Sequence, residues 1–410
     1  MLVAALTLSG VLFGLSTQAH AQDIGGNFPE FAATTGGLRG SFMRPSTARL
    51  ANGKFVLVMG LQASPLINSG IYFQIYTPQG EPIGNFTRVK PTLMLSDHAP
   101  ATAAATGNGG FVVVWAYREH FDAPDRILGQ RYSAAGAKKG SEFQINQTNP
   151  GHIQDQKVVS LADGGFVVVW NAGPNKSGSG EIYARRYNDT GGAVGGEFIV
   201  NTTQSKTQSF PAVAGLGNGG FVVAWNLPAA GGHVDIYGQR FAANGRKAGA
   251  EFTITSAVGK SENAPVIAGL HGGGFVVAWT GSATHAVHGR RFNGNGVALG
   301  AEFLVGEPNY GGWEPLALTV LDDDRFLVAY SKSGDNIYAK LLGPTAAADA
   351  TTTEFRVNST ATAPQRVDPS AVALSNRNVF VAWKFYPTGT PATPPAASRS
   401  PRGPVMLLLL

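Results

Sequence analysis

Two segments of the chain carry side chains whose types fit ligand binding, AYREHFDAPDR at 116–126 and GEPNYGGWEP at 306–315. Aromatic rings with a polar atom stack on sugars or anchor protein partners, and nearby polar groups fix the orientation of the ligand. With two histidines from other loops, these residues predict a binding surface for a carbohydrate or a protein. The candidate ligand-binding residues are Tyr117, Arg118, His120, Asp122, His233, His285, Tyr310 and Trp313.

Residue patterns specific for catalysis or for a cofactor are missing from the sequence. The histidines have no H-x-x-x-H or carboxylate spacing, and the chain has no cysteine. The acidic run at 322–324 falls in an ordinary hairpin turn, and the glycines at 177–180 lack the Lys-Ser/Thr that phosphate binding requires. A G-x-S-x-G nucleophile elbow is also absent. We therefore expect no catalytic residues, no metal and no cofactor.

These candidate residues are interspersed with a repeat that occurs seven times. Its most regular part is an apolar segment such as GGFVVVW, preceded by a turn. The copies end at Met59, Trp115, Trp170, Trp225, Trp279, Tyr330 and Trp383, which lie 51 to 56 residues apart. A period of this size is typical of solenoids and propellers.

Within one repeat the sequence predicts four strands, for example at 211–216, 221–225, 235–241 and 251–255. The GNGG between the first two supplies the positive φ angles of a tight hairpin. The second strand is apolar at nearly every position, which indicates burial on both faces and places the tryptophans in the core. Four strands in about 54 residues are typical of a propeller blade.

Charged residues also recur at fixed places in the repeat. The third strand carries Arg131, Arg186, Arg240 and Arg291, and the fourth begins with Glu142, Glu197, Glu251 and Glu302. The first repeat has Ile75 and Asn85 at these places, so both charges are lost together, which favours cross-strand Arg–Glu pairs. The sixth repeat has Leu341 with Glu354, so the pairing is a hypothesis.

The N-terminal region carries two signals. Residues 1–21 form an apolar run that ends in Ala19-His20-Ala21, which predicts a cleaved signal peptide, a buried strand or helix being the alternative. Residues 25–35 resemble the fourth strand and turn at 195–203. This N-terminal strand is expected to close an all-β, seven-bladed β-propeller of four-stranded blades, since an unclosed ring leaves an exposed edge.

The propeller is expected to form one domain over residues 22–386, followed by a different kind of sequence. Residues 387–410 are rich in Pro, Ser and Arg, which predicts a disordered tail of the kind that a frameshift would produce. The apolar run at 406–410 is too short to cross a bilayer.

The repeat resembles one found in secreted bacterial proteins, with the pattern GGFVVVW, then IYGQRF, then GxEFxVN, over residues 25–386. Such copies occur in large surface, adhesin-like and RTX-associated proteins. The resemblance implies a secreted β-propeller-type module and no catalytic residues. The nonapeptide Gly/Asp calcium repeats of some relatives are absent from this chain, as is the sialidase-type box S-x-D-x-G-x-x-W.

The formal charge of +5 over 410 residues is a modest excess, and it favours an acidic partner such as an anionic polysaccharide or an envelope surface. Lys and Arg do not form runs interleaved with aromatic residues, so nucleic acid is not an expected partner. We expect a monomer without a transmembrane segment, secreted or in the periplasm of a bacterium.

The loops after the second and fourth strands of each repeat vary in length and chemistry, and we call the side where they gather the variable-loop face. Binding residues tend to lie on variable loops held by a rigid frame. We therefore expect a non-enzymatic propeller that binds a carbohydrate or a protein through this face. Two alternatives stay open: a polysaccharide-active hydrolase or lyase with its acid and base at the channel mouth, and a structural fragment of a surface adhesin. Fold alone does not decide among them.

Overall fold

The computed structural model describes most of the repeat region. The described residues are 30–32, 40–42, 44–63, 69–91, 101–118, 125–148, 151–173, 180–204, 206–256, 261–282, 285–307, 315–332, 336–345, 353–358, 364–374, 378–387 and 405–409. The signal peptide expected at 1–21 lies outside them. Apart from one short 3-10 turn, η2 (Ala230–Gly232), the regular structure of this described part is all strand.

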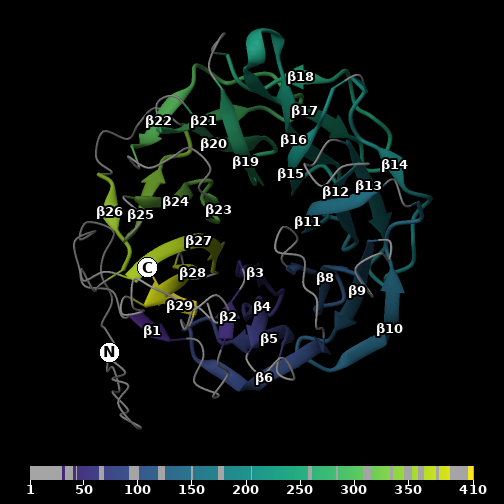
Figure 1. Ribbon diagram of the computed structural model, residues 1–410, viewed down its shortest axis with the longest axis vertical. Coiled ribbons are helices and arrows are strands. Elements are labelled where there is room, and N and C mark those ends of the chain that lie inside the picture. Colours follow the sequence, from purple (N-terminus) through teal and green to yellow (C-terminus); the bar gives the residue numbers. More distant parts are fainter. Residues whose placement is uncertain are drawn as a thin grey trace, which may run out of the picture.

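Six sheets of the described chain are blades built from consecutive strands and arranged around a common axis (Figure 1). The expected β-propeller with four-stranded blades is thus confirmed, and the first blade has a fifth, short strand in addition. The first three blades contain β2 (Gly40–Phe42), β3 (Ser46–Arg49), β4 (Phe55–Ala63), β5 (Gly70–Tyr76) and β6 (Pro82–Pro91); β7 (Thr102–Ala105), β8 (Phe111–Tyr117), β9 (Arg126–Tyr132) and β10 (Lys138–Gln144); and β11 (His152–Ser160), β12 (Phe166–Gly173), β13 (Glu181–Tyr187) and β14 (Phe198–Ile199).

The next three blades follow the same antiparallel order from the axis outward. They contain β15 (Ser209–Gly215), β16 (Phe221–Pro228), β17 (Val234–Phe241) and β18 (Phe252–Thr253); β19 (Glu262–Gly269), β20 (Phe275–Gly281), β21 (Val287–Phe292) and β22 (Phe303–Gly306); and β23 (Ala317–Val320), β24 (Phe326–Lys332), β25 (Asn336–Leu342) and β26 (Phe355–Arg356).

One further sheet combines strands from the two ends of the chain. Its order is β27 (Pro364–Ala373), β28 (Val379–Pro387), β29 (Val405–Leu409) and β1 (Glu30–Ala32). The strand β29 occupies the place where the other sheets have an IYGQRF-like strand, and β1 pairs with it at the outer edge. Residues 405–409 therefore differ from the disordered tail expected over 387–410, because β29 pairs with β28 on one side and with β1 on the other. Residues 388–404 lie outside the described chain.

The hairpin between the first and second strands follows the expected turn chemistry. In the second and fourth blades Gly109 and Gly219 adopt φ angles of 81° and 85°, which residues with a Cβ rarely adopt. The side-chain oxygens of Asn108 and Asn218 accept hydrogen bonds from the backbone two residues later. These turns are short and alike, so they set the strand register without adding chemistry.

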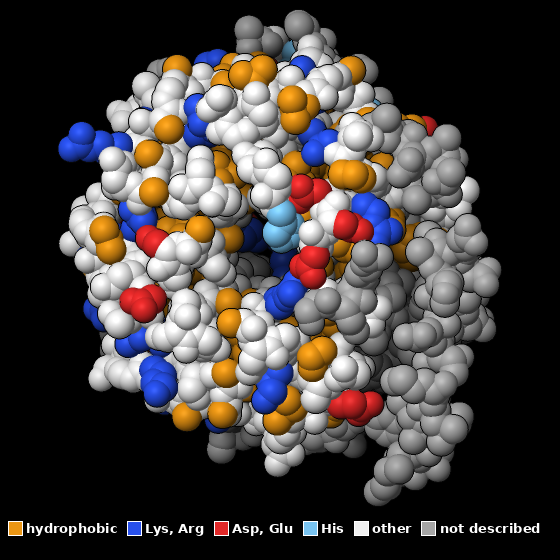
Figure 2. All heavy atoms as spheres, turned by 180° about the vertical axis from the view of Figure 1, so that it is seen from behind, with side chains coloured by type: hydrophobic (Ala, Val, Ile, Leu, Met, Phe, Trp, Pro, Cys, Tyr) orange, Lys and Arg blue, Asp and Glu red, His pale blue; other side chains and the backbone are white. Residues whose placement is uncertain are grey.

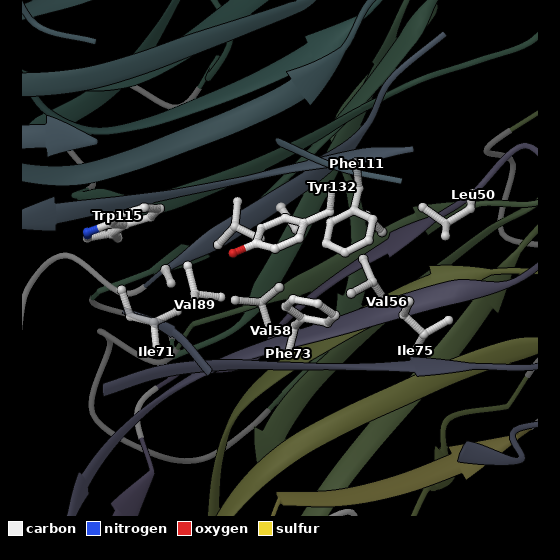
Figure 3. Close-up of a cluster of buried hydrophobic side chains, with 14 of the residues drawn as sticks. Leu50, Val56, Val58, Ile71, Phe73, Ile75, Val89, Phe111, Trp115 and Tyr132 are labelled. Atoms are coloured by element: carbon white, nitrogen blue, oxygen red, sulfur yellow. The ribbon is translucent and has the colours of Figure 1, made fainter. Parts of the chain in front are cut away.

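The tryptophan column lies in the core, as the apolar second strands predict. Five fully buried tryptophans come from these strands: Trp115, Trp170, Trp225, Trp279 and Trp383. Apolar clusters fill the space between neighbouring sheets; one of them joins Val58 and Phe73 of the first blade to Phe111 and Trp115 of the second (Figure 3). Full burial of one such side chain stabilises the fold by about 1.5–3 kcal/mol.

The predicted Arg–Glu pairing within a blade is wrong. Glu251 accepts hydrogen bonds from the Thr202 amide at 3.2 Å and the Thr203 hydroxyl at 3.1 Å, both in the preceding blade's loop. Arg240 instead donates to the carbonyl of Gly294 in the next blade at 2.7 Å. The reason is the shortness of β18, which starts only after Glu251 and leaves this side chain free to reach the neighbouring blade.

Candidate functional site

The first strands of the sheets line a central channel. Each contacts the next around the axis, in the order β3, β7, β11, β15, β19, β23 and β27, and β27 contacts β3. The half of the channel towards the variable-loop face holds a cavity of about 260 Å³, which we call the axial cavity. Its charged and polar lining residues are Arg44, Ser46, Thr47, Thr102, Lys157, Asp368 and Ser370.

A β-bulge shapes several of the strands that line the axial cavity. The pairing of β11, β15, β19 and β27 with their second strands shifts register near the start of each first strand. Asp155, Phe210, Ala264 and Asp368 at these bulges have φ between 51° and 57°, although none is glycine. Bulges re-aim side chains, and such backbone strain is concentrated at functional sites.

Lys157 is the one charged residue at its register position in the first strands described. It pairs with Val169 of β12, the residue before the core Trp170. The residues at the same position of the other six sheets are Ser46, Thr102, Ala212, Val266, Ala317 and Ser370. The lysine is therefore a specific departure from a pattern of small, apolar or hydroxyl side chains.

The charges in the axial cavity influence one another. Burial lowers the pKa of the Lys157 ammonium, and this effect outweighs the opposite influence of Asp155; Arg44 lowers the pKa further and Asp368 raises it. Arg44 forms an ion pair with Asp368, whose atoms Nε and Oδ1 lie 3.1 Å apart. Lys157 consequently gives up its proton more readily than an exposed lysine does. It shares the cavity with the guanidinium of Arg44, which is paired with Asp368.

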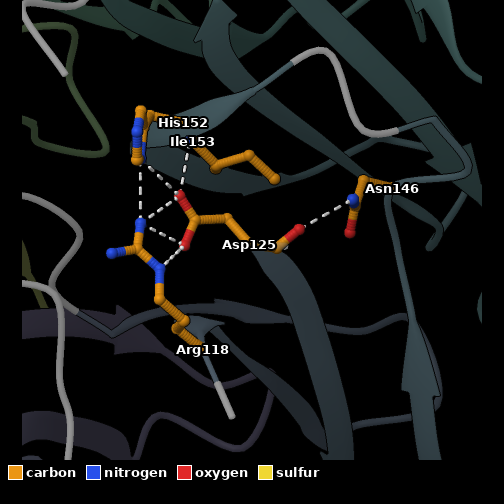
Figure 4. A network of polar contacts seen from close by, with 5 residues as sticks. All are labelled: Arg118, Asp125, Asn146, His152 and Ile153. Carbon is orange, nitrogen blue, oxygen red and sulfur yellow. Dashed lines mark hydrogen bonds and ion pairs between the residues drawn. The ribbon is translucent and has the colours of Figure 1, made fainter. Parts of the chain in front are cut away.

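A second polar group lies on the variable-loop face, where blades two and three meet (Figure 4). Nε and Nη2 of Arg118 each donate to the carboxylate of Asp125 at 2.7 Å. The backbone amide of Ile153 donates to the same carboxylate at 3.0 Å, and Nη2 of Arg118 lies 2.9 Å from Nδ1 of His152. We call Arg118, Asp125 and His152 the rim cluster, because His152 begins β11, one of the channel-lining strands.

The contact with Arg118 orients the ring of His152. A guanidinium only donates hydrogen bonds, so Nδ1 of His152 is the acceptor in this contact, and Nε2 is the other ring nitrogen. Nδ1 also lies 3.5 Å from Oδ2 of Asp125. Arg118 and His152 are therefore held together around the Asp125 carboxylate.

The short hairpins between the first and second strands lie at the opposite mouth of the channel. Figure 2 shows the hollow at the centre of one face of the ring, with charged side chains around it. A cavity of about 380 Å³ at the mouth with the hairpins is lined by mostly apolar residues that include Val213 and Ile267, and by His271 at the edge. Asp324 accepts hydrogen bonds from the amides of His271 at 2.6 Å and Gly272 at 2.8 Å. The acidic run at 322–324 therefore joins neighbouring turns, as expected of a turn segment.

Comparison with known proteins shows similarity in fold. No family model matches the chain, and no curated protein matches it. A protein of unknown function from Dyadobacter fermentans aligns with a TM-score of 0.51 and 15% identity over 93% of this chain and 98% of its own. A polysaccharide lyase, an ulvan lyase bound to GlcA(1-4)Rha3S, aligns with a TM-score of 0.55 and 11% identity over 90% of this chain and 94% of its own. An intramolecular trans-sialidase from Ruminococcus gnavus aligns with a TM-score of 0.50 and 9% identity over 96% of this chain and 98% of its own.

The structure places some of the sequence-predicted residues. Tyr117 ends β8 half-buried, with the Lys90 ammonium 5.4 Å from its ring centroid, and Arg118 belongs to the rim cluster. His233 precedes β17 and His285 precedes β21, both half-buried and in other blades, and within the described part of the chain we find no contact that joins them to the rim cluster. The remaining four, His120, Asp122, Tyr310 and Trp313, lie outside the described chain.

Sequence reasoning missed the residues of the axial cavity. Arg44, Lys157 and Asp368 lie on or beside first strands, which the repeat marked only as scaffold. A signal was present, since aligning the first strands shows a lysine where the other copies have small, apolar or hydroxyl residues. His152 is not among the sequence-predicted binding residues, because its contact with Arg118 spans 34 residues of sequence.

Proposed function

We propose that this protein is an exported polysaccharide-active enzyme, a lyase that cleaves uronate-containing chains at the axial cavity. The observation that carries the proposal is that Lys157, whose pKa is lowered by burial, shares one cavity with Arg44. The lyase among the structures of similar fold supports a polysaccharide as the substrate class. The positive net charge favours an acidic chain.

The chemistry of β-elimination fits the two basic side chains of the cavity, the Arg44 guanidinium and the Lys157 amine. Arg44, which is paired with Asp368 through Nε, binds the uronate carboxylate through its Nη atoms, and this contact makes the neighbouring C5 proton more acidic. The free amine of Lys157 takes that proton, the electron pair forms the C4–C5 double bond, and the C4–O4 bond breaks. The Lys157 ammonium then returns a proton to the leaving O4, so atoms and charge balance. A lowered lysine pKa increases the fraction of free amine near neutral pH.

We also propose that the ring is a seven-bladed propeller closed by the N-terminal strand. The pairing of β1 with β29 and the contact of β27 with β3 support this closure. The Arg44–Asp368 ion pair and the 2.9 Å hydrogen bond between Thr47 and Ser370 cross this same seam. Closure of the ring would thus also assemble one wall of the axial cavity. The apolar leader expected at 1–21 supports export.

A non-enzymatic carbohydrate-binding propeller is the second candidate function. The rim cluster favours it, because Nδ1 of His152 is engaged with Arg118 and the group presents donors only. Under this candidate the protein holds an acidic polysaccharide without cleaving it. The two candidates differ in one product, the C4–C5 unsaturated sugar end.

The test is incubation of the mature protein with polygalacturonate, alginate and a neutral galactan, followed by ultraviolet absorbance of the unsaturated product. We expect cleavage of at least one uronate polymer and none of the galactan. Replacing Lys157→Met should lower turnover by about 100-fold or more, the usual contribution of a positioned general base. The matched control Lys138→Met makes the same replacement at an exposed lysine of β10, outside the axial cavity, and should keep the activity.

Three outcomes would contradict the lyase. Binding of a uronate polymer without any unsaturated product would favour the non-enzymatic candidate. Cleavage with new reducing ends but no absorbance would indicate hydrolysis. Equal turnover by the Lys157→Met and Lys138→Met variants would remove the axial cavity from the reaction.

A further inference from the structure

The rim cluster presents two hydrogen-bond donors that the described contacts do not use. Arg118 binds Asp125 through Nε and Nη2, which leaves Nη1, and His152 accepts through Nδ1, which leaves the Nε2 proton. The side chains of Arg118 and His152 are 24% and 30% exposed, whereas that of Asp125 is 5% exposed. The donors are therefore accessible while the group that holds them is buried.

The buried part of the rim cluster keeps these donors in place. The Asp125 carboxylate receives two bonds from Arg118 and a third from the Ile153 amide. Asn146 donates to the main-chain carbonyl of Asp125 at 3.3 Å, and its own side-chain oxygen accepts from the Ile127 amide at 2.7 Å. Donors held before binding lose little conformational entropy when a ligand arrives.

Charge and position define the ligand that fits. The positive charge of Arg118 is balanced by the buried carboxylate of Asp125, and His152 contacts both side chains, so the cluster suits an uncharged oxygen acceptor such as a sugar hydroxyl. His152 begins β11, and Lys157 lies five residues further along the same strand. At about 3.3 Å per residue this spacing is too long for one sugar ring but is within the reach of an oligosaccharide.

We propose that Arg118 and His152 form a sugar subsite that binds a hydroxyl oxygen of a unit near the uronate held in the axial cavity. The proposal rests on the proposed function, because the cavity supplies the other end of the ligand. The subsite makes the enzyme selective for chains over single sugars. Asp125 is a positioning residue that acts only through Arg118 and His152.

The experiment measures binding by calorimetry in the Lys157→Met background, which retains Arg44 and lacks the proposed base. The probes are galacturonate, tri-galacturonate, and tri-galacturonate methyl-esterified at its terminal units. We expect the trimer to bind at least about tenfold more tightly than the monomer, and His152→Ala to remove that advantage, the loss of about one hydrogen bond. His152→Gln keeps an acceptor for Arg118 and an outward donor, so it should restore most of the affinity.

The controls separate the subsite from folding and from the cavity. His271→Ala, on the opposite face, should leave trimer affinity unchanged, and the urea midpoints of all variants should agree. If none of the three probes binds even the unaltered protein, the substrate class of the proposed function fails and the subsite with it. If the trimer binds the His152→Ala variant undiminished, the subsite is overturned while the cavity stands. A loss of affinity on esterification equal to that of His152→Ala would overturn the assignment of a hydroxyl ligand.

Discussion

The two arcs of the axial cavity are built from the same repeat but carry different chemistry. One arc, which we call the charged arc, contains Arg44, Lys157 and Asp368. The other, the apolar arc, contains Ala212, Val266 and Ala317 from three successive blades.

The arcs are comparable residue by residue, because Lys157, Ala212 and Val266 each pair with the residue before a core tryptophan. The backbone register is thus shared, and only the side chains differ. Single channel-lining residues of the first strands can therefore carry charged side chains while the backbone of the repeat stays the same. Functional residues of this propeller need not lie on its variable loops.

The largest effect should fall equally on both arcs. Trp170→Ala, behind the charged arc, and Trp225→Ala, behind the apolar arc, should each lower the free energy of unfolding by about 3–5 kcal/mol, since both side chains are fully buried. Urea denaturation measures the loss. If only one of the two substitutions lowered the free energy of unfolding, the two arcs would not share the same core packing.

The next effect should be specific to the rim beside the charged arc. Asp125→Ala removes a buried carboxylate and leaves Arg118 and the Ile153 amide without their acceptor, so we expect a loss of about 3 kcal/mol. Val234→Ala, at the start of the third strand of blade four, should cost less than half as much. If thermal unfolding showed the same loss of stability for both variants, the hydrogen bonds of the Asp125 carboxylate would not stabilise the fold as expected.

Lys157 should give the charged arc a pH dependence that the apolar arc lacks. Its pKa in the folded protein is lowered, so the unfolded chain binds more protons between that pKa and the ordinary lysine value. Stability should therefore rise with pH across this window. Lys157→Met should flatten the rise and add about 1 kcal/mol near neutral pH. Denaturation at several pH values tests this, and a slope unchanged by the substitution would contradict it.

The smallest effect should again be common to both sides. Glu197→Ala and Glu251→Ala each remove hydrogen bonds to the preceding blade, from Gln147 and Thr148 in the first case and from Thr202 and Thr203 in the second. Because the glutamates are near the surface, we expect about 1 kcal/mol for each in urea denaturation. Coupling of Glu251 with Arg240 in a double-mutant cycle would restore the rejected cross-strand pair.

Much of the fold could be predicted from local sequence. Positive φ at Gly109 and Gly219 and the buried column from Trp115 to Trp383 follow directly from the GGFVVVW-type copies. Contacts between blades could not be predicted in the same way. Glu251 binds the neighbouring blade because its own outer strand is only two residues long, a detail that propensity does not fix.

The candidate site was predictable only in part, for a similar reason. Arg118 was expected as a ligand-binding residue from its loop, but its partner His152 comes from the next blade. Lys157 reaches the cavity beyond a bulge at Asp155, a non-glycine residue with a φ of 51°. Strain of this kind is imposed by the surrounding structure and leaves no local signal.

The most direct test of the account is chemical rescue of the missing amine. Turnover of a uronate polymer by the Lys157→Ala variant should be lost, and added methylamine should restore part of it in proportion to the concentration of free amine. The unsaturated product should reappear with the rate. Full activity of Lys157→Ala without methylamine would contradict the claim that Lys157 is the base in the axial cavity.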